Sequence, residues 1–173
     1  MTAMEIDKPL VGIGPLVADI DEEKRQAAMD IGALAAFEPR DREARKEIMK
    51  LSNGGVAGAV DFAGAEGSMK FALGALRKGG KLVIAGLIGG NFEMPIPMFP
   101  LRAIALEGSY VGTLEEAHEI LDMMRQGKIA PIRIEKRPLT AANDTLEQIR
   151  AGKIVGRAVL TPDERLSAAI AHQ

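Results

Sequence analysis

The sequence contains no cysteine and no tryptophan, and aromatic residues make up only 3% of its 173 residues. The missing cysteines exclude disulfide bonds and thiolate metal ligands. They do not indicate whether the protein resides in an oxidising or a reducing compartment. The two histidines, His118 and His172, are too few and too far apart to supply the three or four convergent ligands of a catalytic metal site. The shortage of aromatic residues argues against a stacking platform for single-stranded nucleic acid. We therefore expect no zinc or other metal in this chain.

The sequence also lacks an excess of charge and a long apolar run. Its net charge of −2 gives no electrostatic basis for binding nucleic acid or an anionic membrane. No apolar run reaches the roughly 18 residues that span a bilayer, and the first residues, M-T-A-M-E-I-D-K-P, do not resemble a secretory signal. We therefore expect a cytoplasmic protein that binds neither nucleic acid nor a membrane. The remaining composition, 47% hydrophobic and 27% charged, is that of an ordinary globular chain of one domain or slightly more.

Residues 56–87 are the most informative stretch. Their apolar pattern predicts strands at 59–63 and 81–85 and a helix at 68–76, with a helix stop of two cations and two glycines at 77–80. Two buried strands joined by a crossover helix form a βαβ unit, and such units build parallel sheets that are covered on both faces.

The same alternation continues on both sides of this unit. Further strands are predicted at 16–19, 35–37, 104–111, 134–139 and 155–161, and further helices at 21–31, 41–51, 113–126 and 142–151. Three prolines at 95, 97 and 100 exclude a helix or a central strand over 94–100. The alternation predicts a doubly wound α/β fold, in which ligands bind beyond the carboxyl ends of the strands. Gly64 and Gly86 fall at such ends.

A glycine pair near the start, Gly12 and Gly14, does not complete a dinucleotide fingerprint. That motif needs a third glycine at a strand-to-helix turn, where this sequence has Val17 and a strand instead. We therefore interpret the pair as part of a loop or linker and residues 1–15 as an irregular N-terminal segment.

Asp19 is the most informative single residue, because it ends a predicted strand. An acid at this place in a doubly wound fold accepts hydrogen bonds from the adenosine ribose and repels a 2′-phosphate. The alternative is a helix cap, but Asp21 already fills that position. We favour ribose binding, with Lys24 one helical turn further on and within reach of the same ribose. No residue is a convincing nucleophile, general base or relay, so we predict no catalytic residue.

Five segments together resemble the medium-chain (zinc-type) alcohol dehydrogenase and quinone oxidoreductase superfamily. They are V-A-D-I-D-E-E-K-R, G-x-V-D-F-A-G, L-R-K-G-G-K-L-V-I-A-G-L, E-G-S-Y-V-G and P-L-x-x-A-N-D-T-L-E-Q-I-R-A-G-K-I-V-G-R-A-V-L. They occur in family order from about Leu16 to Leu160, about five-sixths of the chain.

The resemblance implies a site for NAD. The residues that it assigns to cofactor binding are Asp19 and Lys24 at the adenosine ribose, Phe62 and Ala63 along the adenosine, Gly86 and Leu87 at the nicotinamide ribose, Tyr110 and Val111 at the carboxamide, and Arg157 at the pyrophosphate. The resemblance also implies a homodimer that pairs through the extended segment Asn91–Pro95.

The sequence departs from the family in what it lacks. The catalytic domain, the first strand of the cofactor domain and its glycine-rich turn are absent, which implies a truncated, Rossmann-like parallel sheet. Residues 16–112 would form a partial dinucleotide-binding domain, and 113–173 a C-terminal α+β segment resembling the return to the catalytic domain. The first strand is central in this fold, so we hypothesise that Leu10–Gly14, or a neighbouring subunit, partly fills the gap.

The resemblance leaves three functions open. In the first, the chain is expected to be the cofactor-binding portion of an NAD-dependent alcohol dehydrogenase, inactive alone and binding NAD weakly if at all. Alternatively it is a non-enzymatic oligomerisation or regulatory module, or a gene fragment, derived from such an enzyme.

Overall fold

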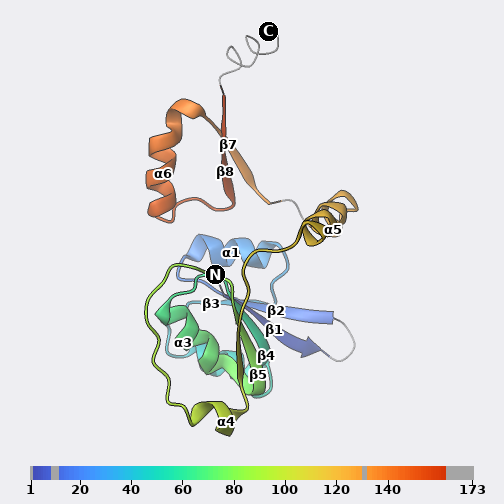
Figure 1. Cartoon of the computed structure of the whole chain (residues 1–173), viewed down its shortest axis with the longest axis vertical. Coiled ribbons are helices and arrows are strands. Elements are labelled where there is room, and N and C mark those ends of the chain that lie inside the picture. The colour runs from blue at the N-terminus through green and yellow to red at the C-terminus, as the bar shows by residue number, and fades with distance from the viewer. Residues whose placement is uncertain (1, 9–11, 130–131, 163–173) are drawn as a thin grey trace. The chain divides into compact units, whose positions relative to one another are not determined.

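The structure is a computed structural model that describes residues 2–8, 12–129 and 132–162 (Figure 1). The chain divides into two compact units, Met1–Leu114 and Glu115–Gln173. The first unit contains β1 (Thr2–Lys8), β2 (Gly12–Ala18), α1 (Glu22–Asp30), β3 (Ala35–Phe37), α2 (Ala44–Leu51), β4 (Val56–Asp61), α3 (Glu66–Ala75), β5 (Leu76–Ile84), α4 (Met98–Arg102) and β6 (Ala105–Gly108). The second contains α5 (Leu114–Arg125), which starts at the boundary, then β7 (Ile134–Pro138), a 3-10 turn (Leu139–Ala141), α6 (Ala142–Arg150) and β8 (Arg157–Thr161).

The first unit is built on a six-stranded sheet with the order β3-β2-β1-β4-β5-β6. β2 pairs with β3, β4 with β5, and β5 with β6, in each case in parallel. β1 lies between β2 and β4 and is antiparallel to both. The predicted α/β class and its parallel strand pairs are therefore confirmed, whereas the prediction of a wholly parallel sheet is wrong at the central strand.

The N-terminal segment that was predicted to be irregular provides this central strand. Thr2 pairs with Ala18 on one side and with Asp61 on the other, and Lys8 pairs with Gly12. The chain thus fills the gap itself, but with residues 2–8 rather than 10–14. Residues 12–14 begin β2, and residues 10 and 11 lie outside the described part of the chain. The physical reason is that β2 and β4 would otherwise each leave a row of unpaired backbone groups in the middle of the sheet.

One hydrophobic core holds α2 and α3 against the sheet. Its members are Leu16, Ala18, Phe37, Ala44, Ile48, Val56, Ala59, Phe71, Ala72, Leu73, Ala75, Leu76, Leu82 and Ile104. Leu16 and Ala18 of β2 belong to this core, and the intervening Val17 is buried on the opposite face, as the alternation of a strand requires. Ala28 of α1 is buried outside this core, so helices lie on both faces of the sheet, as in a doubly wound fold.

Several element boundaries differ from the prediction. β4 ends at Asp61 and β6 at Gly108, so the predicted strands 59–63 and 104–111 extend too far at their carboxyl ends. The residues predicted as a helix stop, 77–80, belong to β5, which follows α3 directly, and Gly79 adopts a φ of 77° within it. The proline-rich segment contains the short helix α4, although a helix was excluded there. Pro97 caps this helix and Pro100 lies in its first turn, where backbone N–H groups have no partner within the helix, so proline is tolerated.

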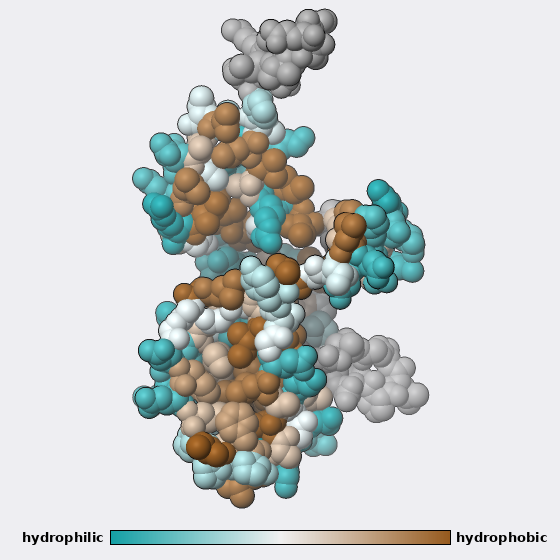
Figure 2. Space-filling model, viewed as in Figure 1, coloured by the Kyte–Doolittle hydropathy of each residue, from teal (hydrophilic) through white to brown (hydrophobic). Residues whose placement is uncertain are grey.

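The second unit packs α6 beside the parallel pair β7 and β8. Arg137 of β7 holds the helix by donating hydrogen bonds to Thr145 Oγ1 at 3.2 Å and to Gln148 Oε1 at 2.8 Å. Apolar side chains remain exposed on this unit, and Figure 2 shows them as a brown area over α6, β7 and β8. They include Ile134, Leu139, Leu146, Ile149 and Val159. Among the described residues, no helix is long and apolar enough to cross a membrane.

Candidate cofactor site

The carboxyl ends of β2, β4, β5 and β6 lie along one edge of the sheet, because these strands run in the same direction. Eight of the nine predicted cofactor residues follow these ends. They are Asp19 and Lys24 after β2, Phe62 and Ala63 after β4, Gly86 and Leu87 after β5, and Tyr110 and Val111 after β6. The structure therefore brings residues from four separate segments to a single edge.

Asp19 stabilises the turn between β2 and α1. Its backbone N–H donates to the carbonyl of Phe37, its Oδ1 accepts a hydrogen bond from the Asp21 N–H at 2.9 Å, and the residue is only 7% exposed. Asp21 is the helix cap, because its carboxylate accepts the Lys24 N–H at 3.1 Å. The assignment of the cap to Asp21 is confirmed, and Asp19 is left at the strand end where an adenosine ribose is expected.

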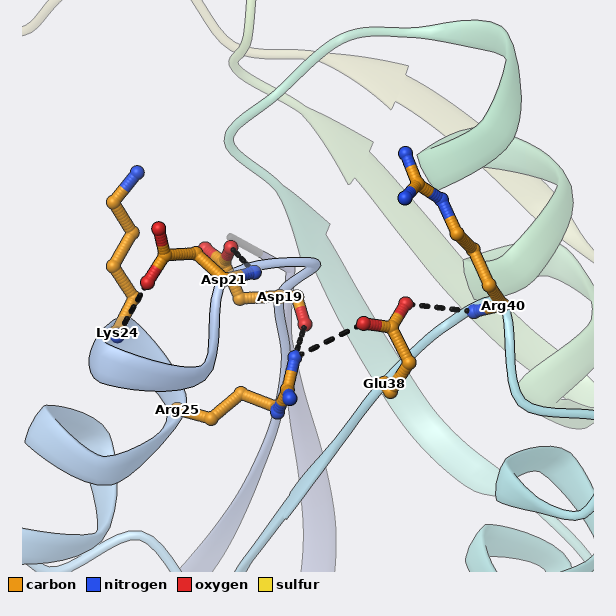
Figure 3. A network of polar contacts seen from close by, with 6 residues as sticks. All are labelled: Asp19, Asp21, Lys24, Arg25, Glu38 and Arg40. Atoms are coloured by element: carbon orange, nitrogen blue, oxygen red, sulfur yellow. Dashed lines mark hydrogen bonds and ion pairs between the residues drawn. The ribbon is translucent and has the colours of Figure 1, made fainter. Parts of the chain in front are cut away.

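A network of ionic contacts joins the end of β2 to the end of β3 (Figure 3). Arg25 Nη1 donates to the carbonyl oxygen of Asp19 at 2.7 Å and to Glu38 Oε2 at 3.1 Å. The second oxygen of Glu38 accepts the backbone N–H of Arg40 at 3.0 Å. Each of these contacts involves a charged group, and such hydrogen bonds are the stronger ones. The two turns are therefore fixed relative to each other.

The second turn of the site, after β4, is organised by Asp61. This residue is fully buried, and its Oδ1 accepts the N–H groups of Ala63 and Gly64 while its Oδ2 accepts the hydroxyl of Ser68 in α3. Its carbonyl oxygen accepts the N–H groups of Ala85 and Gly86 after β5. One buried residue thus fixes the shape of both neighbouring turns.

Gly64 and Gly86 bring these two turns into direct backbone contact. A Cβ atom on Gly86 would lie 2.1 Å from the Ala63 carbonyl carbon, and one on Gly64 would lie 2.0 Å from the Gly86 carbonyl oxygen. Gly64 also has a φ of 65°, which favours glycine. No other residue type fits at either position without moving the backbone.

Apolar side chains line this edge and are exposed to solvent. Phe62, Leu87, Tyr110 and Val111 are 55%, 78%, 75% and 80% exposed. Val111 has a φ of 49°, an uncommon conformation for a β-branched residue that recurs at functional sites. An exposed apolar strip of this kind is typical of a surface that a ligand or another protein covers.

The centre of the edge fits a dinucleotide less well than its two sides. In dinucleotide-binding folds the central strand leads into a glycine-rich turn and a helix, whose N-terminus holds the pyrophosphate. Here the antiparallel β1 begins at this edge, with Thr2 beside Ala18 and Asp61, and it leads away from the edge. Within the described residues no turn leads from the central strand into a helix at this place, so the residues present fit the adenosine and nicotinamide sides but not the pyrophosphate.

The ninth predicted residue, Arg157, is not brought to this edge by the first unit. It is exposed at the start of β8 in the second unit, where its guanidinium donates to the carbonyl oxygen of Gly156. Its approach to a pyrophosphate stays a prediction. In the described part of the chain, no group of three or more histidine, aspartate or glutamate side chains is arranged to hold a metal ion.

Residues 1–126 match the zinc-binding dehydrogenase family. The chain belongs to this family. It is 35% identical over 152 residues to an alcohol dehydrogenase of Geobacillus stearothermophilus, which covers 87% of this chain and 44% of the relative. An alcohol dehydrogenase of Moraxella sp. (strain TAE123) is likewise 35% identical, over 150 residues and the same shares of both chains.

The solved structures agree with the family assignment. The alcohol dehydrogenase of the hyperthermophilic archaeon Aeropyrum pernix superposes with a TM-score of 0.78 at 34% identity, over 85% of this chain and 42% of that one. The chain therefore spans less than half the length of these relatives, and the matched part is the NAD-binding portion of medium-chain alcohol dehydrogenases. The family resemblance seen in the sequence is thereby confirmed.

Sequence reasoning missed Asp61, Arg25, Glu38 and Arg40 as organisers of the site. An aspartate that interrupts an otherwise apolar strand was a usable signal for Asp61, because a buried carboxylate requires hydrogen-bond donors. Arg25 and Glu38 are 13 residues apart and belong to different elements, so no local pattern links them.

Proposed function

We propose that this chain binds the nicotinamide cofactor NAD as the cofactor-binding portion of an alcohol dehydrogenase. The observation that carries the proposal is the convergence of the segments after β2, β4, β5 and β6 at one edge of the sheet, in a chain of this family. Asp19 is the ribose acceptor, and its negative charge favours the free 2′-hydroxyl of NAD. When bound, the nicotinamide ring exchanges a hydride with an alcohol or carbonyl substrate.

The residues of this chain would bind and orient the cofactor. Phe62 and Ala63 would lie along the adenosine, while the backbone near Gly86 and Leu87 and that of Tyr110 and Val111 would face the nicotinamide side. Because β1 provides no pyrophosphate-binding turn, we propose that affinity for NAD is weak and that this chain alone does not turn over an alcohol. Alcohol-dependent formation of NADH by the purified chain would contradict this second point.

Calorimetric titration with NADH tests the proposal. Replacing Asp19 with asparagine should weaken NADH binding by about tenfold, since hydrogen bonds to a charged group are worth roughly 1.5–3 kcal/mol. Asp30→Asn is the matched control, because Asp30 is an exposed acid at the other end of α1 and the change in charge is the same. No binding of NADH at millimolar concentration, or equal effects of the two substitutions, would contradict the proposal.

A non-enzymatic oligomerisation or regulatory module is the second candidate. The exposed apolar side chains of the second unit favour it, as do Leu114, Ile120 and Leu121 on α5, which are 74%, 52% and 49% exposed. Asn91–Pro95, which belongs to no strand within this chain, would pair across a two-fold axis in such an assembly. Light scattering distinguishes the candidates in combination with the titration, because a module would be a stable dimer that does not bind NADH.

A further inference from the structure

The strand β8 has a free edge, the side that faces away from β7, which no strand covers within the described part of the chain. Its neighbour is β7, and the two strands form a parallel pair (Figure 1). A sheet of two strands is only marginally stable by itself, and parallel strands are normally part of larger sheets. The free edge of β8 is therefore a place where a further strand would extend the sheet.

The outer edges of β7 and β8 differ in how well they are protected against such pairing. Lysine and proline are typical of edge strands that do not pair further. The strand β7, I-E-K-R-P, contains both, as Lys136 and Pro138. The strand β8, R-A-V-L-T, contains neither, and its central residues are apolar. The edge of β8, rather than that of β7, is thus open to another strand.

The backbone groups that point to the free edge are those of Ala158 and Leu160. The Arg157 N–H donates to the carbonyl oxygen of Arg133 at 2.9 Å, so Arg157 directs its backbone groups toward β7. Successive residues of a strand direct these groups to opposite sides. A second β8 that runs antiparallel, with a two-fold axis at Val159, would place Ala158 of each chain opposite Leu160 of the other. All the outward groups of both residues would then be hydrogen-bonded.

Neither neighbouring register of such a pair uses these groups fully. A pair centred on Ala158 would place Leu160 opposite Gly156, which lies before the strand and has a φ of 94°. A pair centred on Leu160 would place Ala158 opposite Pro162, which has no N–H to donate. The pairing of β8 with its copy therefore has one preferred register.

The side chains of β8 suit the same register. Arg137 donates hydrogen bonds to α6, and its partner across the sheet is Leu160, so Val159 lies on the face away from α6. Val159 is 40% exposed in the single chain, and the two-fold axis would bring it against its copy. Arg157 would lie opposite Thr161, so like charges do not oppose each other along the strand.

We infer that a second copy of this chain occupies the free edge, and that two chains dimerise through antiparallel pairing of β8 with β8. Two sheets of two strands then become one sheet of four, with the protected edges of β7 on the outside. The inference goes beyond the proposed function and does not depend on it, because β8 belongs to the second unit and the sheet that carries the cofactor edge to the first. It also differs from a pairing through Asn91–Pro95, which belongs to the first unit.

Sedimentation and light scattering of the full chain test this interface. The wild-type chain should dimerise with a dissociation constant below about 0.1 mM. Ala158→Pro removes an outward N–H from an edge strand, where proline is tolerated, and should weaken dimerisation at least about tenfold, because the symmetry loses that hydrogen bond twice. Lys136→Pro is the matched control. Arg133 directs its carbonyl oxygen to β8, so the N–H of Lys136, three residues further on, points to the outer edge of β7, and the dissociation constant should change less than about twofold.

Substitutions of Val159 test the register and do not rely on a proline variant that folds. Val159→Glu and Val159→Lys each place like charges opposite each other at the two-fold axis, so each variant alone should be monomeric. An equimolar mixture of the two should dimerise, because opposite charges then meet. Unfolding of the second unit by the substitutions would not be reversed by mixing, so this rescue distinguishes the interface from a loss of structure.

Two results overturn the inference. One is a wild-type chain that stays monomeric at about 1 mM, which would leave the edge of β8 to a different polypeptide. The other is a dimer that is unchanged both in Ala158→Pro and in the Val159 variants, which would place the interface elsewhere. NADH binding is measured separately, so either result leaves the proposed function standing.

Discussion

Asp19 directly follows β2 and Asp61 is the last residue of β4, the two strands that flank β1. Both are buried, and both accept backbone N–H groups from the turn that follows. Asp61 also accepts the Ser68 hydroxyl through its second carboxylate oxygen, so its charge is compensated by protein donors on both oxygens. Asp61 is therefore a structural residue of both turns.

Substitution of Asp61 should destabilise the first unit. Asp61→Ala removes the acceptor of two N–H groups and a hydroxyl in a buried place, and we expect a loss of about 3 kcal/mol or more in the free energy of unfolding. Asp61→Asn keeps one oxygen acceptor, and its amide can donate to the Ser68 hydroxyl, so the loss should be about 1 kcal/mol. Urea unfolding measures both, and equal losses would contradict this assignment of the hydrogen bonds.

Glycine substitutions test the close contact between the turns after β4 and β5. Gly86→Ala would place a Cβ about 2 Å from backbone atoms of Ala63 and Gly64, and it should cost about 3 kcal/mol of unfolding free energy. Gly67→Ala is the control, since Gly67 lies in α3 with no atom within 4 Å of the added Cβ. The control should stabilise the protein by up to about 1 kcal/mol. A Gly86→Ala variant as stable as the wild type would show that the turns separate easily.

At the scale of the elements, most strands and helices follow from local patterns, but the central strand does not. Ala35–Phe37 forms β3 as predicted, and Asp21 caps α1 as predicted, because both signals are local. The assignment of residues 2–8 to a central strand depends on partners 4 to 59 residues away, namely β2 and β4. A polar and apolar mixture of seven residues carries no sign of such partners. The family's missing strand explained why a gap had to be filled, but not the direction of the strand that fills it.

Proline in β1 tests whether this strand is central. Over Thr2–Glu5, β1 pairs on both sides, so the N–H of Met4 donates to one neighbour or the other. Met4→Pro removes that donor and should cost about 3 kcal/mol or more. Glu22→Pro, at the first position of α1, should change stability by less than about 0.5 kcal/mol. Amide hydrogen exchange of β2 and β4 provides the readout, and unchanged protection in Met4→Pro would place β1 outside the sheet.

The pairing of β5 with β6 should depend weakly on pH through one ion pair. Lys81 Nζ donates to Glu107 Oε2 at 2.8 Å, and this hydrogen bond, with the charge of the lysine, lowers the pKa of Glu107 below its ordinary value of 4.5. A lowered folded-state pKa gives stability that is present above pH 4.5 and is lost as the pH falls through the folded-state pKa. The carboxyl NMR signal of Glu107 should titrate below pH 4.5, and Lys81→Gln should restore the ordinary value. An unchanged titration in this variant would exclude the lysine as the cause. The effect on stability should be small, because both side chains are about half exposed.

For the molecule as a whole, the family and the convergence of four strand ends at one edge could be predicted, whereas the direction of the central strand could not. Motifs such as G-x-V-D-F-A-G place residues after known strands, and the parallel order of those strands then brings them together. The orientation of Arg157 depends on how a second unit meets the first, which no local motif encodes. The network of Arg25, Glu38 and Arg40 depends on contacts between two turns, so it required the structure.

The most direct test of the proposed cofactor site is a titration of the isotope-labelled chain with NADH, followed through its backbone amide NMR signals. We predict that the signals of Asp19, Lys24, Ala63, Gly86 and Val111 shift together in a saturable way, because these residues lie along one edge of the sheet. Signals of α6 and of the exposed end of α1 near Asp30 should stay in place and serve as the internal control. Amides at the carboxyl edge that remain unmoved at millimolar NADH, or shifts confined to other surfaces, would contradict the assignment of this edge as the NAD site.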